Sequence, residues 1–461
     1  MSVDRSRLPE VGPDRLFHLP RPVKRRLPSG LEVWSVEHRG VPVFAALLLL
    51  PVGSGHDPED LPGLAAMTAD LLDEGAGRRD VHALHDALAR LGAHLAIECT
   101  PDATVVGLLT LSRHAADALP LLGEVCFEPR LAADDFERVR TLRRNRLAQM
   151  RDAASALADR VLLATLFRGH PYAHLPIGTE AALSRLTLAD VQAFHAREFH
   201  PGRATLVMVG DLAHDEAAAL ADRVMARSAR PGAAPGRPAT VRAAEAARAP
   251  EVVVVDRANA QQSELRVGRV GAARSVEGYH RLVVANAVLG GQFTSRINLN
   301  LREQKGYTYG ARSYFEFRAA PGPFVVQAAV QTDASAAALR EVFAEMDGLR
   351  GERPVTAREL ELARQGLTRG YARNFETAEQ IARGMVQLAL HRLPDDTFDR
   401  FIEGVRAVTA GEVTDVARRY FVPDDMLAVL VGDQARVGPA LEAAGFRWRP
   451  VPPDALDAPG A

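Results

Sequence analysis

Two histidines in the stretch DVHALHDAL have a spacing that could bind a metal. His82 and His85 lie one helical turn apart, and His94 follows them in the chain. Imidazoles at positions i and i+3 of a helix share one side and can ligate a single ion. No carboxylate nearby completes an obvious site, so we interpret this cluster as a solvated helix edge.

Two charged segments also have simpler interpretations than a binding site. Asp70 lies close to Asp73 and Glu74, which is typical of a charged helix end. The segment RVRTLRRNRLAQMR, Arg138 to Arg151, is basic, but it has no interleaved aromatic residues and the formal net charge is only −2. A solvated helix face therefore explains it better than nucleic-acid binding. Nucleotide-binding glycine patterns and a G-x-S-x-G nucleophile motif are absent from the sequence.

The stretch DLPGLAAMTADLLDEGAG, Asp60 to Gly77, predicts a helix that begins after a Pro-Gly turn. Ala66, Ala69 and Asp70 share one side of that helix, because positions i, i+3 and i+4 are surface neighbours. The apolar residues recur at helical spacing and predict a buried face: Leu64, Met67, Leu71 and Leu72.

Length and composition predict a globular protein with more than one domain. The chain has 461 residues, of which 47% are hydrophobic and 25% are charged. Cys99 and Cys126 are its only cysteines, which suits a reducing compartment. The run VFAALLLLPV is too short for a membrane span and reads as a buried strand. The start of the sequence has no apolar stretch of signal-peptide length, so we expect a cytoplasmic protein.

A repeated segment links the two halves of the chain. LTLADVQAFHAREFHPGRATLVMVGDL and VTAGEVTDVARRYFVPDDMLAVLVGDQ match at one constant offset, with Thr187 opposite Thr409 and Phe199 opposite Phe421. In each copy a threonine with an acid three residues later predicts a capping box. A proline turn and a β-branched strand follow. A duplicated unit explains this order.

The sequence between the copies predicts where the halves separate. Ser228 to Pro250 is rich in Ala, Pro, Gly and Arg and lacks apolar periodicity. We therefore expect a first domain over residues 1–228, a linker over 229–250 and a second domain over 251–461. Hairpin-like strands mixed with helical pairs in both halves predict an α+β fold with largely antiparallel sheets covered by helices.

These pieces resemble the pitrilysin/insulinase class of zinc peptidases, in its mitochondrial-processing-peptidase-like branch. The resemblance covers nearly the whole chain and depends on GSGHDPEDLPGLA, HPYAHLPIGT, LGGQFTSRINLNLREQKGYTYG and both VGD endings, in this order. It implies two homologous domains that form half of a clamshell. It also implies that two such chains enclose a chamber in which peptides are cut.

Active members of that family carry the inverted zinc motif H-x-x-E-H on the helix after the Pro-Gly turn. Aligning this helix with the family puts Ala66 and Asp70 at the two histidines and Ala69 at the glutamate. The third ligand in the family is a glutamate on a later helix, where this chain has the acid-free segment Arg138 to Arg151. The resemblance thus predicts a degenerate site that binds no zinc. Some of these arginines could occupy the space of the metal.

In the second half the resemblance assigns a role to two residues. Arg302 and Tyr309 match an arginine and a tyrosine that, in active assemblies, reach from the domain opposite the zinc to the substrate. Alternatively, Arg302 is a charge at a helix end and Tyr309 a half-buried strand aromatic. Tyr307 lies on the other strand face and is not expected to contribute. Gly290-Gly291 is most simply a turn before the next helix.

The resemblance therefore implies a non-catalytic subunit of a heterodimeric zinc endopeptidase. A homologous partner with an intact H-x-x-E-H motif would hold the zinc, and this chain would bind no cofactor but would grip the peptide. A structural or peptide-binding protein without a proteolytic partner is the alternative, since some relatives are core subunits of respiratory complexes. An autonomous peptidase would need a metal site that the sequence does not reveal.

Overall fold

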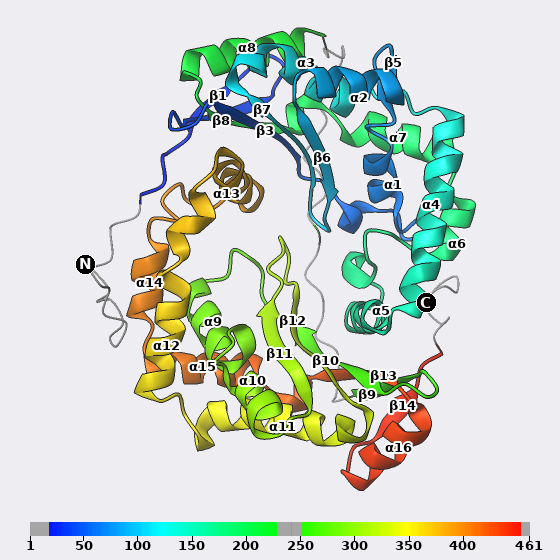
Figure 1. The fold of residues 1–461 in the computed structure, drawn as a ribbon, viewed down its shortest axis with the longest axis vertical. Coiled ribbons are helices and arrows are strands. Elements are labelled where there is room, and N and C mark those ends of the chain that lie inside the picture. The colour runs from blue at the N-terminus through cyan, green and yellow to red at the C-terminus, as the bar shows by residue number, and fades with distance from the viewer. Residues whose placement is uncertain (1–17, 228–240, 242–250, 453–461) are drawn as a thin grey trace, which may run out of the picture.

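The computed structural model describes residues 18–227, 241 and 251–452 (Figure 1). The first half contains these elements in chain order: β1 (Val23–Arg26), β2 (Glu32–Glu37), β3 (Val43–Leu50), η1 (Ser54–His56), α1 (Leu64–Asp70), β4 (Gly75–Ala76), β5 (Arg79–Asp80), α2 (Val81–Arg90), β6 (His94–Cys99), β7 (Thr104–Leu111), η2 (Ser112–His114), α3 (Ala115–Phe127), α4 (Ala133–Asp152), α5 (Ala154–Leu166), η3 (Pro171–Ala173), α6 (Glu180–Arg185), α7 (Leu188–Glu198), η4 (Pro201–Arg203), β8 (Thr205–Gly210) and α8 (His214–Arg227).

The second half repeats this succession of strands and helices. Its elements are β9 (Glu251–Asp256), β10 (Gln262–Val270), α9 (Tyr279–Asn286), η5 (Ala287–Gly291), α10 (Arg296–Asn298), η6 (Leu299–Gln304), β11 (Thr308–Phe315), β12 (Pro323–Gln331), η7 (Thr332–Ala334), α11 (Ser335–Asp347), η8 (Gly348–Glu352), α12 (Ala357–Thr368), η9 (Tyr371–Phe375), α13 (Ala378–His391), α14 (Phe401–Ala407), α15 (Ala410–Tyr420), η10 (Pro423–Asp425), β13 (Leu427–Gly432), α16 (Gln434–Ala443) and β14 (Trp448–Pro450).

Each half forms a mixed sheet, and five strands of each sheet follow the same order, while the edge strands β1 and β14 are not equivalent. The first runs β1-β2-β8-β3-β7-β6 and the second runs β14-β9-β13-β10-β12-β11. In both, the strand of the repeated segment (β8 or β13) pairs in parallel with one neighbour and antiparallel with the other. The predicted α+β class with two homologous, largely antiparallel sheets is confirmed.

The first two long strands of the chain are not neighbours in the sheet. β2 and β3 follow each other in the sequence, yet β8 lies between them. β8 is buried along almost its whole length. A fully buried apolar strand gains most at the centre of a sheet, so the long-range pairing replaces the local hairpin.

The repeated segment forms the same local structure twice. Thr187 caps α7 in a capping box with Asp190, and Thr409 caps α15 in a capping box with Glu412. Phe199 and the equivalent Phe421 are both fully buried. The predicted duplication is therefore visible in the caps, the cores and the strand order. The predicted linker lies outside the described residues except for Val241, which packs beside α5.

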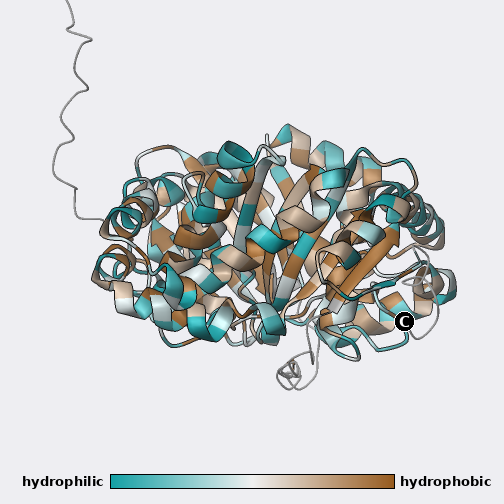
Figure 2. Ribbon diagram, turned by 90° about the horizontal axis from the view of Figure 1, so that it is seen from below, coloured by the Kyte–Doolittle hydropathy of each residue, from teal (hydrophilic) through white to brown (hydrophobic). Residues whose placement is uncertain are grey.

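β3 shows how each sheet is buried on two sides. Its side chains alternate, so that Phe44 and Leu48 enter the core beneath the outer helices while Leu47 and Leu49 face the other side. The continuous apolar run of this strand is thereby explained, and its prediction as a buried strand is confirmed. Apolar residues follow the strands inside the molecule in Figure 2, where the peripheral helices carry more of the hydrophilic colour.

The helices on the inner faces of the sheets are exchanged between the halves. α13 of the second half packs on β3 and β8 of the first sheet, where Ile381 and Met385 contact the face that includes Leu47. α5 of the first half packs on β10 and β13 of the second sheet, with Val161 in the core beside Val429. Figure 1 shows both helices between the two sheets. Each sheet therefore depends on the other half for one of its covers.

Candidate functional site: a degenerate zinc motif and an exposed arginine–tyrosine pair

Helix α1 carries the three positions that the resemblance aligns with the zinc motif. Gly63 precedes it with φ of 104°, and a Cβ there would lie 2.9 Å from the Cα of Gly178, so glycine is required at this turn. The Asp57 carboxylate accepts hydrogen bonds from the backbone N–H groups of Gly63 (2.6 Å) and Ala65 (2.7 Å) at the helix N-terminus. Burial raises the pKa of Asp57 to about 7 against the opposing effect of these bonds. The predicted apolar face of the helix is buried.

Two of the three substituted motif positions are filled by small buried side chains. Ala66 is 4% exposed and Ala69 is 1% exposed. Methyl groups supply neither a metal ligand nor a general base. These two positions therefore contribute only packing to α1.

Asp70, at the third position, forms an ion pair with Arg143 of the arginine-rich helix α4. Arg143 of α4 donates from Nη1 to Oδ2 of Asp70 at 2.5 Å and from Nη2 to the carbonyl oxygen of Pro176 at 2.9 Å. The Arg143 side chain is only 8% exposed, whereas that of Asp70 is 48% exposed. A permanently charged guanidinium thus lies beside the motif, and it would repel a cation.

Three other arginines of α4 are also paired with acids, and Arg140 contacts Glu137. Arg138 contacts Glu74 and Asp135, and Arg144 contacts Glu180. The paired arginines of this segment form a partly solvated helix face, whereas Val139, Arg143 and Leu147 are buried.

The histidines of the alternative cluster lie on the surface of the first half. His82 and His85 are exposed on α2, and His94 is exposed at the start of β6. Among the residues that the structure describes, no group of three or more His, Cys, Asp or Glu side chains could hold a metal ion.

Arg302 and Tyr309 of the second half line one cavity of about 590 Å³. Arg302 lies in the last turn of the π-helical segment η6, and its guanidinium stacks over the ring of Phe293 at 4.6 Å from the ring centroid. Its ion pair is with the adjacent Glu303, at 3.4 Å. Stacking on an aromatic ring fixes the plane of the guanidinium while its N–H groups stay available to a ligand.

Tyr309 projects from an irregular edge strand. The pairing register of β11 with β12 shifts between Thr308 and Ala311, and such a bulge turns side chains out of the ladder. Tyr309 is 89% exposed, so it is not the half-buried aromatic of the alternative interpretation. Tyr307, in contrast, packs against the core of the second half. An exposed phenol beside an arginine is suited to contact with another molecule.

Two further residues of this cavity were not predicted from the sequence. Phe293 is 63% exposed, and its ring stacks against the Arg302 guanidinium. Arg312 donates from Nε and Nη2 to the Gln327 side-chain oxygen at 2.9 Å, with that amide in the orientation that satisfies both groups. In the sequence, a phenylalanine close to arginines in the polar segment GGQFTSRINLNLRE is the signal that could have indicated Phe293.

Gly290-Gly291 ends a helix instead of forming an isolated turn. The pair closes the π-helical segment η5, which continues α9. A Cβ on Gly290 would lie 2.8 Å from the backbone nitrogen of Ser313 in β11, so glycine permits the helix to approach the strand. Both glycines line the cavity with Arg302 and Tyr309.

The structure does not bring the two candidate regions into one pocket. The residues that line the cavity around Arg302 come from the second half, apart from Ser155 at the start of α5, and include none of Ala66, Ala69 and Asp70. Within one chain, the degenerate motif and the arginine–tyrosine pair are therefore separate.

Comparisons with known proteins agree with this arrangement. Residues 33–180 match the model of insulinase (peptidase family M16), and residues 185–367 match the model described as the peptidase M16 inactive domain. A protein of Mycobacterium tuberculosis named an uncharacterized zinc protease is 27% identical over 406 residues, which cover 86% of this chain and 90% of the relative. Subunit 1 of the mitochondrial cytochrome b-c1 complex of Bos taurus is 25% identical over 208 residues, 45% of this chain and 43% of that subunit.

A solved structure adds a close match over the whole fold. The crystal structure of a peptidase M16 inactive domain from Pseudomonas fluorescens superposes with a TM-score of 0.83 at 26% identity. The match covers 89% of this chain and 98% of the chain in that structure. None of the helices in the described parts of the chain is long and apolar enough to cross a lipid bilayer. Both family models match in the expected order along one chain with the duplicated fold, and the protein belongs to peptidase family M16.

Proposed function

We propose that this chain is the non-catalytic, substrate-binding subunit of a heterodimeric zinc endopeptidase. A homologous chain with an intact H-x-x-E-H motif supplies the zinc and the general base. This chain completes the chamber, in the cytoplasm, and binds peptides or unfolded proteins. The contrast between the two halves carries the proposal: Ala66 and Ala69 are buried and inert, whereas Tyr309 is 89% exposed beside Arg302 in a cavity.

The chemistry of the pair supports a role at the partner's metal. When a zinc-bound water attacks a peptide carbonyl, negative charge develops on the carbonyl oxygen. A phenol hydroxyl or a guanidinium N–H directed at that oxygen stabilises the charge. Arg302 and Tyr309 provide both groups, and both line one cavity.

Co-expression with a homologous H-x-x-E-H chain tests the proposal. We expect a one-to-one complex with a buried surface above ~2,000 Å², as is typical of obligate partners. The complex should cut unfolded peptides, and each chain alone should be far less active. A catalytic homologue that is fully active alone and does not bind this chain would exclude the subunit role.

A structural or peptide-binding role without proteolysis is the second candidate. The similarity to a subunit of the cytochrome b-c1 complex favours it, because that relative is named as a component of a larger complex. In that case the complex with the catalytic homologue would not form, and substitutions at Arg302 and Tyr309 would change no cleavage rate.

A further inference from the structure

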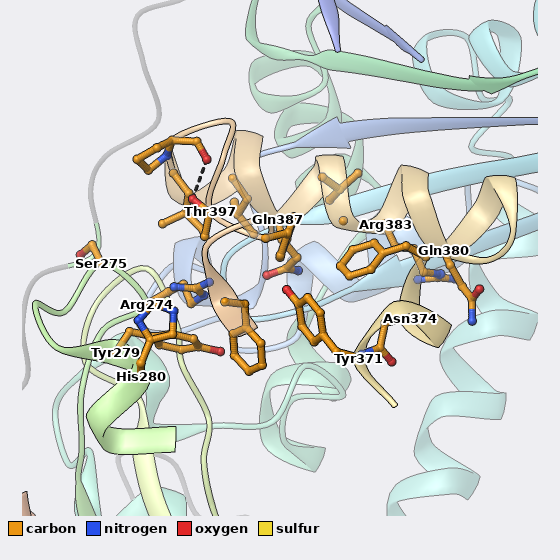
Figure 3. A pocket seen from close by; sticks show the side chains of 18 of the residues that line it. Arg274, Ser275, Tyr279, His280, Tyr371, Asn374, Gln380, Arg383, Gln387 and Thr397 are labelled. Atoms are coloured by element: carbon orange, nitrogen blue, oxygen red, sulfur yellow. Dashed lines mark hydrogen bonds between the residues drawn. The ribbon is translucent and has the colours of Figure 1, made fainter. Parts of the chain in front are cut away.

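A second cavity, of about 930 Å³, lies between the two halves and apart from Arg302 and Tyr309. The first half contributes residues of β3, β6 and β7, such as Leu47, Glu98 and Val105. The second half contributes α9, η9, α13 and the start of α14. Figure 3 shows the polar side chains of this cavity, with Arg274, Tyr279 and His280 at one end and Gln380 and Arg383 at the other.

Arg274 is a cation without a carboxylate partner. Its guanidinium lies over the ring of Tyr279, at 3.8 Å from the ring centroid. Among the described residues, no carboxylate oxygen lies within 4.0 Å of it. Arg383 in the same cavity differs, since it pairs with Glu98 at 3.3 Å and with Glu379 at 3.1 Å. A half-buried guanidinium without a carboxylate partner can still donate hydrogen bonds to a ligand.

Two acids that act on neighbours of Arg274 are hydrogen-bonded to other groups. Asp102, which acts electrostatically on the neighbouring His391, accepts hydrogen bonds from the Tyr172 hydroxyl and from the backbone N–H of Ala319. Asp399, which acts on Tyr371, accepts a hydrogen bond from the N–H of Leu19 at 2.8 Å. Within the part of the chain that the structure describes, neither acid pairs with Arg274.

The histidines near Arg274 do not add to its charge. Burial lowers the pKa of His280, and the charge of Arg274 lowers it further. Burial lowers the pKa of His391 to about 4, with Asp102 opposing and Arg274 adding to this effect. Burial also lowers the pKa of Arg274, which the phenols of Tyr279 and Tyr371 oppose, but a guanidinium stays protonated at neutral pH. Arg274 is thus the cationic centre of this end of the cavity.

Aromatic and amide side chains surround the cation. Tyr371 stacks on Phe401 with ring centroids 4.3 Å apart, and Phe375 packs against Phe398. Asn374, Gln380 and Gln387 line the same space, and a side-chain amide can both donate to and accept from a peptide group. The volume exceeds that needed by a small inorganic anion. A ligand with a carboxylate, apolar side chains and peptide groups matches these walls.

We propose that this cavity binds the carboxylate of a peptide, with Arg274 as the residue that holds it. The carboxylate is either the free C-terminus or an acidic side chain. This site involves neither the zinc nor the partner chain, so the inference goes beyond the proposed function and is testable on the isolated full-length chain.

Binding of three labelled peptides to the purified chain tests the proposal. The first peptide ends in phenylalanine with a free carboxylate, the second is its C-terminal amide, and the third is the amide with one internal glutamate. Fluorescence anisotropy should show about 10- to 100-fold tighter binding of the free acid than of the amide, as expected for a charge-assisted hydrogen bond. Equal affinity of the wild-type chain for all three peptides overturns the proposal. If the glutamate-containing amide binds as weakly as the plain amide, the ligand is a C-terminal carboxylate. If it binds as tightly as the free acid, side-chain carboxylates also bind.

Substitutions of two arginines in the same cavity distinguish a specific role of Arg274 from a general effect of positive charge. Arg274→Gln should abolish the preference for the carboxylate peptides, and Arg274→Lys should keep part of it. Arg383→Gln makes the same charge change but removes an arginine that is already paired, and it should leave the preference intact. Equal loss in Arg274→Gln and Arg383→Gln would show that Arg274 is not the ligand. Melting curves identify any variant that fails to fold, and the comparison of acid with amide on the wild-type chain remains decisive in that event.

Discussion

Arg143 and Asp70 join α4 to the last residue of α1 through a 2.5 Å contact between Nη1 and Oδ2. The second Arg143 Nη also binds the carbonyl oxygen of Pro176, so one guanidinium connects three segments of the first half. In catalytic members of the family, the resemblance places a zinc between the equivalent helices. Here an ion pair links them, so a contact between side chains holds α1 against α4.

The first prediction is that the purified chain carries no stoichiometric zinc. Zinc should also fail to raise the melting temperature beyond the effect of weak surface binding. The triple variant Ala66→His, Ala69→Glu and Asp70→His should remain inactive, because the third carboxylate is absent and Arg143 loses its acid. Elemental analysis that finds one tightly held zinc per chain, or peptide cleavage by the triple variant, would contradict this prediction.

The second prediction concerns the stability of the α1–α4 contact. Asp70→Asn leaves the Arg143 guanidinium, 8% exposed, without a carboxylate. We expect a loss of roughly 1–3 kcal/mol in the free energy of unfolding, measured by urea denaturation. Asp135→Asn is the matched control, because it weakens the more exposed contact with Arg138 and should cost less than about 1 kcal/mol. Similar losses in both variants would show that the Arg143 pair has no special role.

The third prediction tests Arg302 and Tyr309 in the assembled complex. Arg302→Ala or Tyr309→Phe should lower kcat of the complex by a factor of about 10²–10³, because each removes a donor to the developing negative charge. Assembly and zinc content should not change. Tyr307→Phe is the control, since Tyr307 packs against the core instead of lining the cavity. Wild-type rates for both site variants in an intact complex would favour the structural role.

The fourth prediction is a pH dependence of stability due to Glu359. Burial alone would raise the pKa of this carboxyl, but hydrogen bonds from Arg296 and from Thr356 lower it to about 2. The folded-state pKa is below the unfolded value, so the contribution is present above about pH 4.5 and is lost as the pH falls toward 2. The free energy of unfolding of Glu359→Gln should therefore be lower than that of the wild type by roughly 2–3 kcal/mol at pH 7 and nearly equal to it at pH 2. Chemical denaturation at both pH values measures this difference, and a pH-independent loss would refute the assignment.

The fifth prediction follows from the exchanged helices. A fragment of residues 1–228 lacks α13 and exposes Trp34, Leu47 and Leu49 on the inner face of its sheet. A fragment of residues 251–461 lacks α5 and exposes Val253 and Val429. Each fragment alone should aggregate or bind a hydrophobic dye, and co-expression should yield a soluble complex. Cooperative unfolding of either fragment as a monomer would show that the exchanged helices are dispensable.

Local patterns in the sequence determined the individual elements. The capping boxes at Thr187 and Thr409 depend on side chains three residues apart, and the buried face of α1 depends on helical periodicity. The apolar run of β3 predicted a buried strand for the same reason. Each of these features is set by neighbours in the chain, so each could be predicted from the sequence.

Tertiary packing decided the features that depend on distant residues. The position of β8 between β2 and β3 results from burial at the centre of the sheet, which no local pattern encodes. The partner of Asp70, the exposure of Tyr309 and the stacking of Arg274 on Tyr279 depend on where α4, β11 and α9 pack. The sequence identifies which side chains carry charge, but whether a charge is paired, buried or open to a ligand is fixed only when remote segments are brought together.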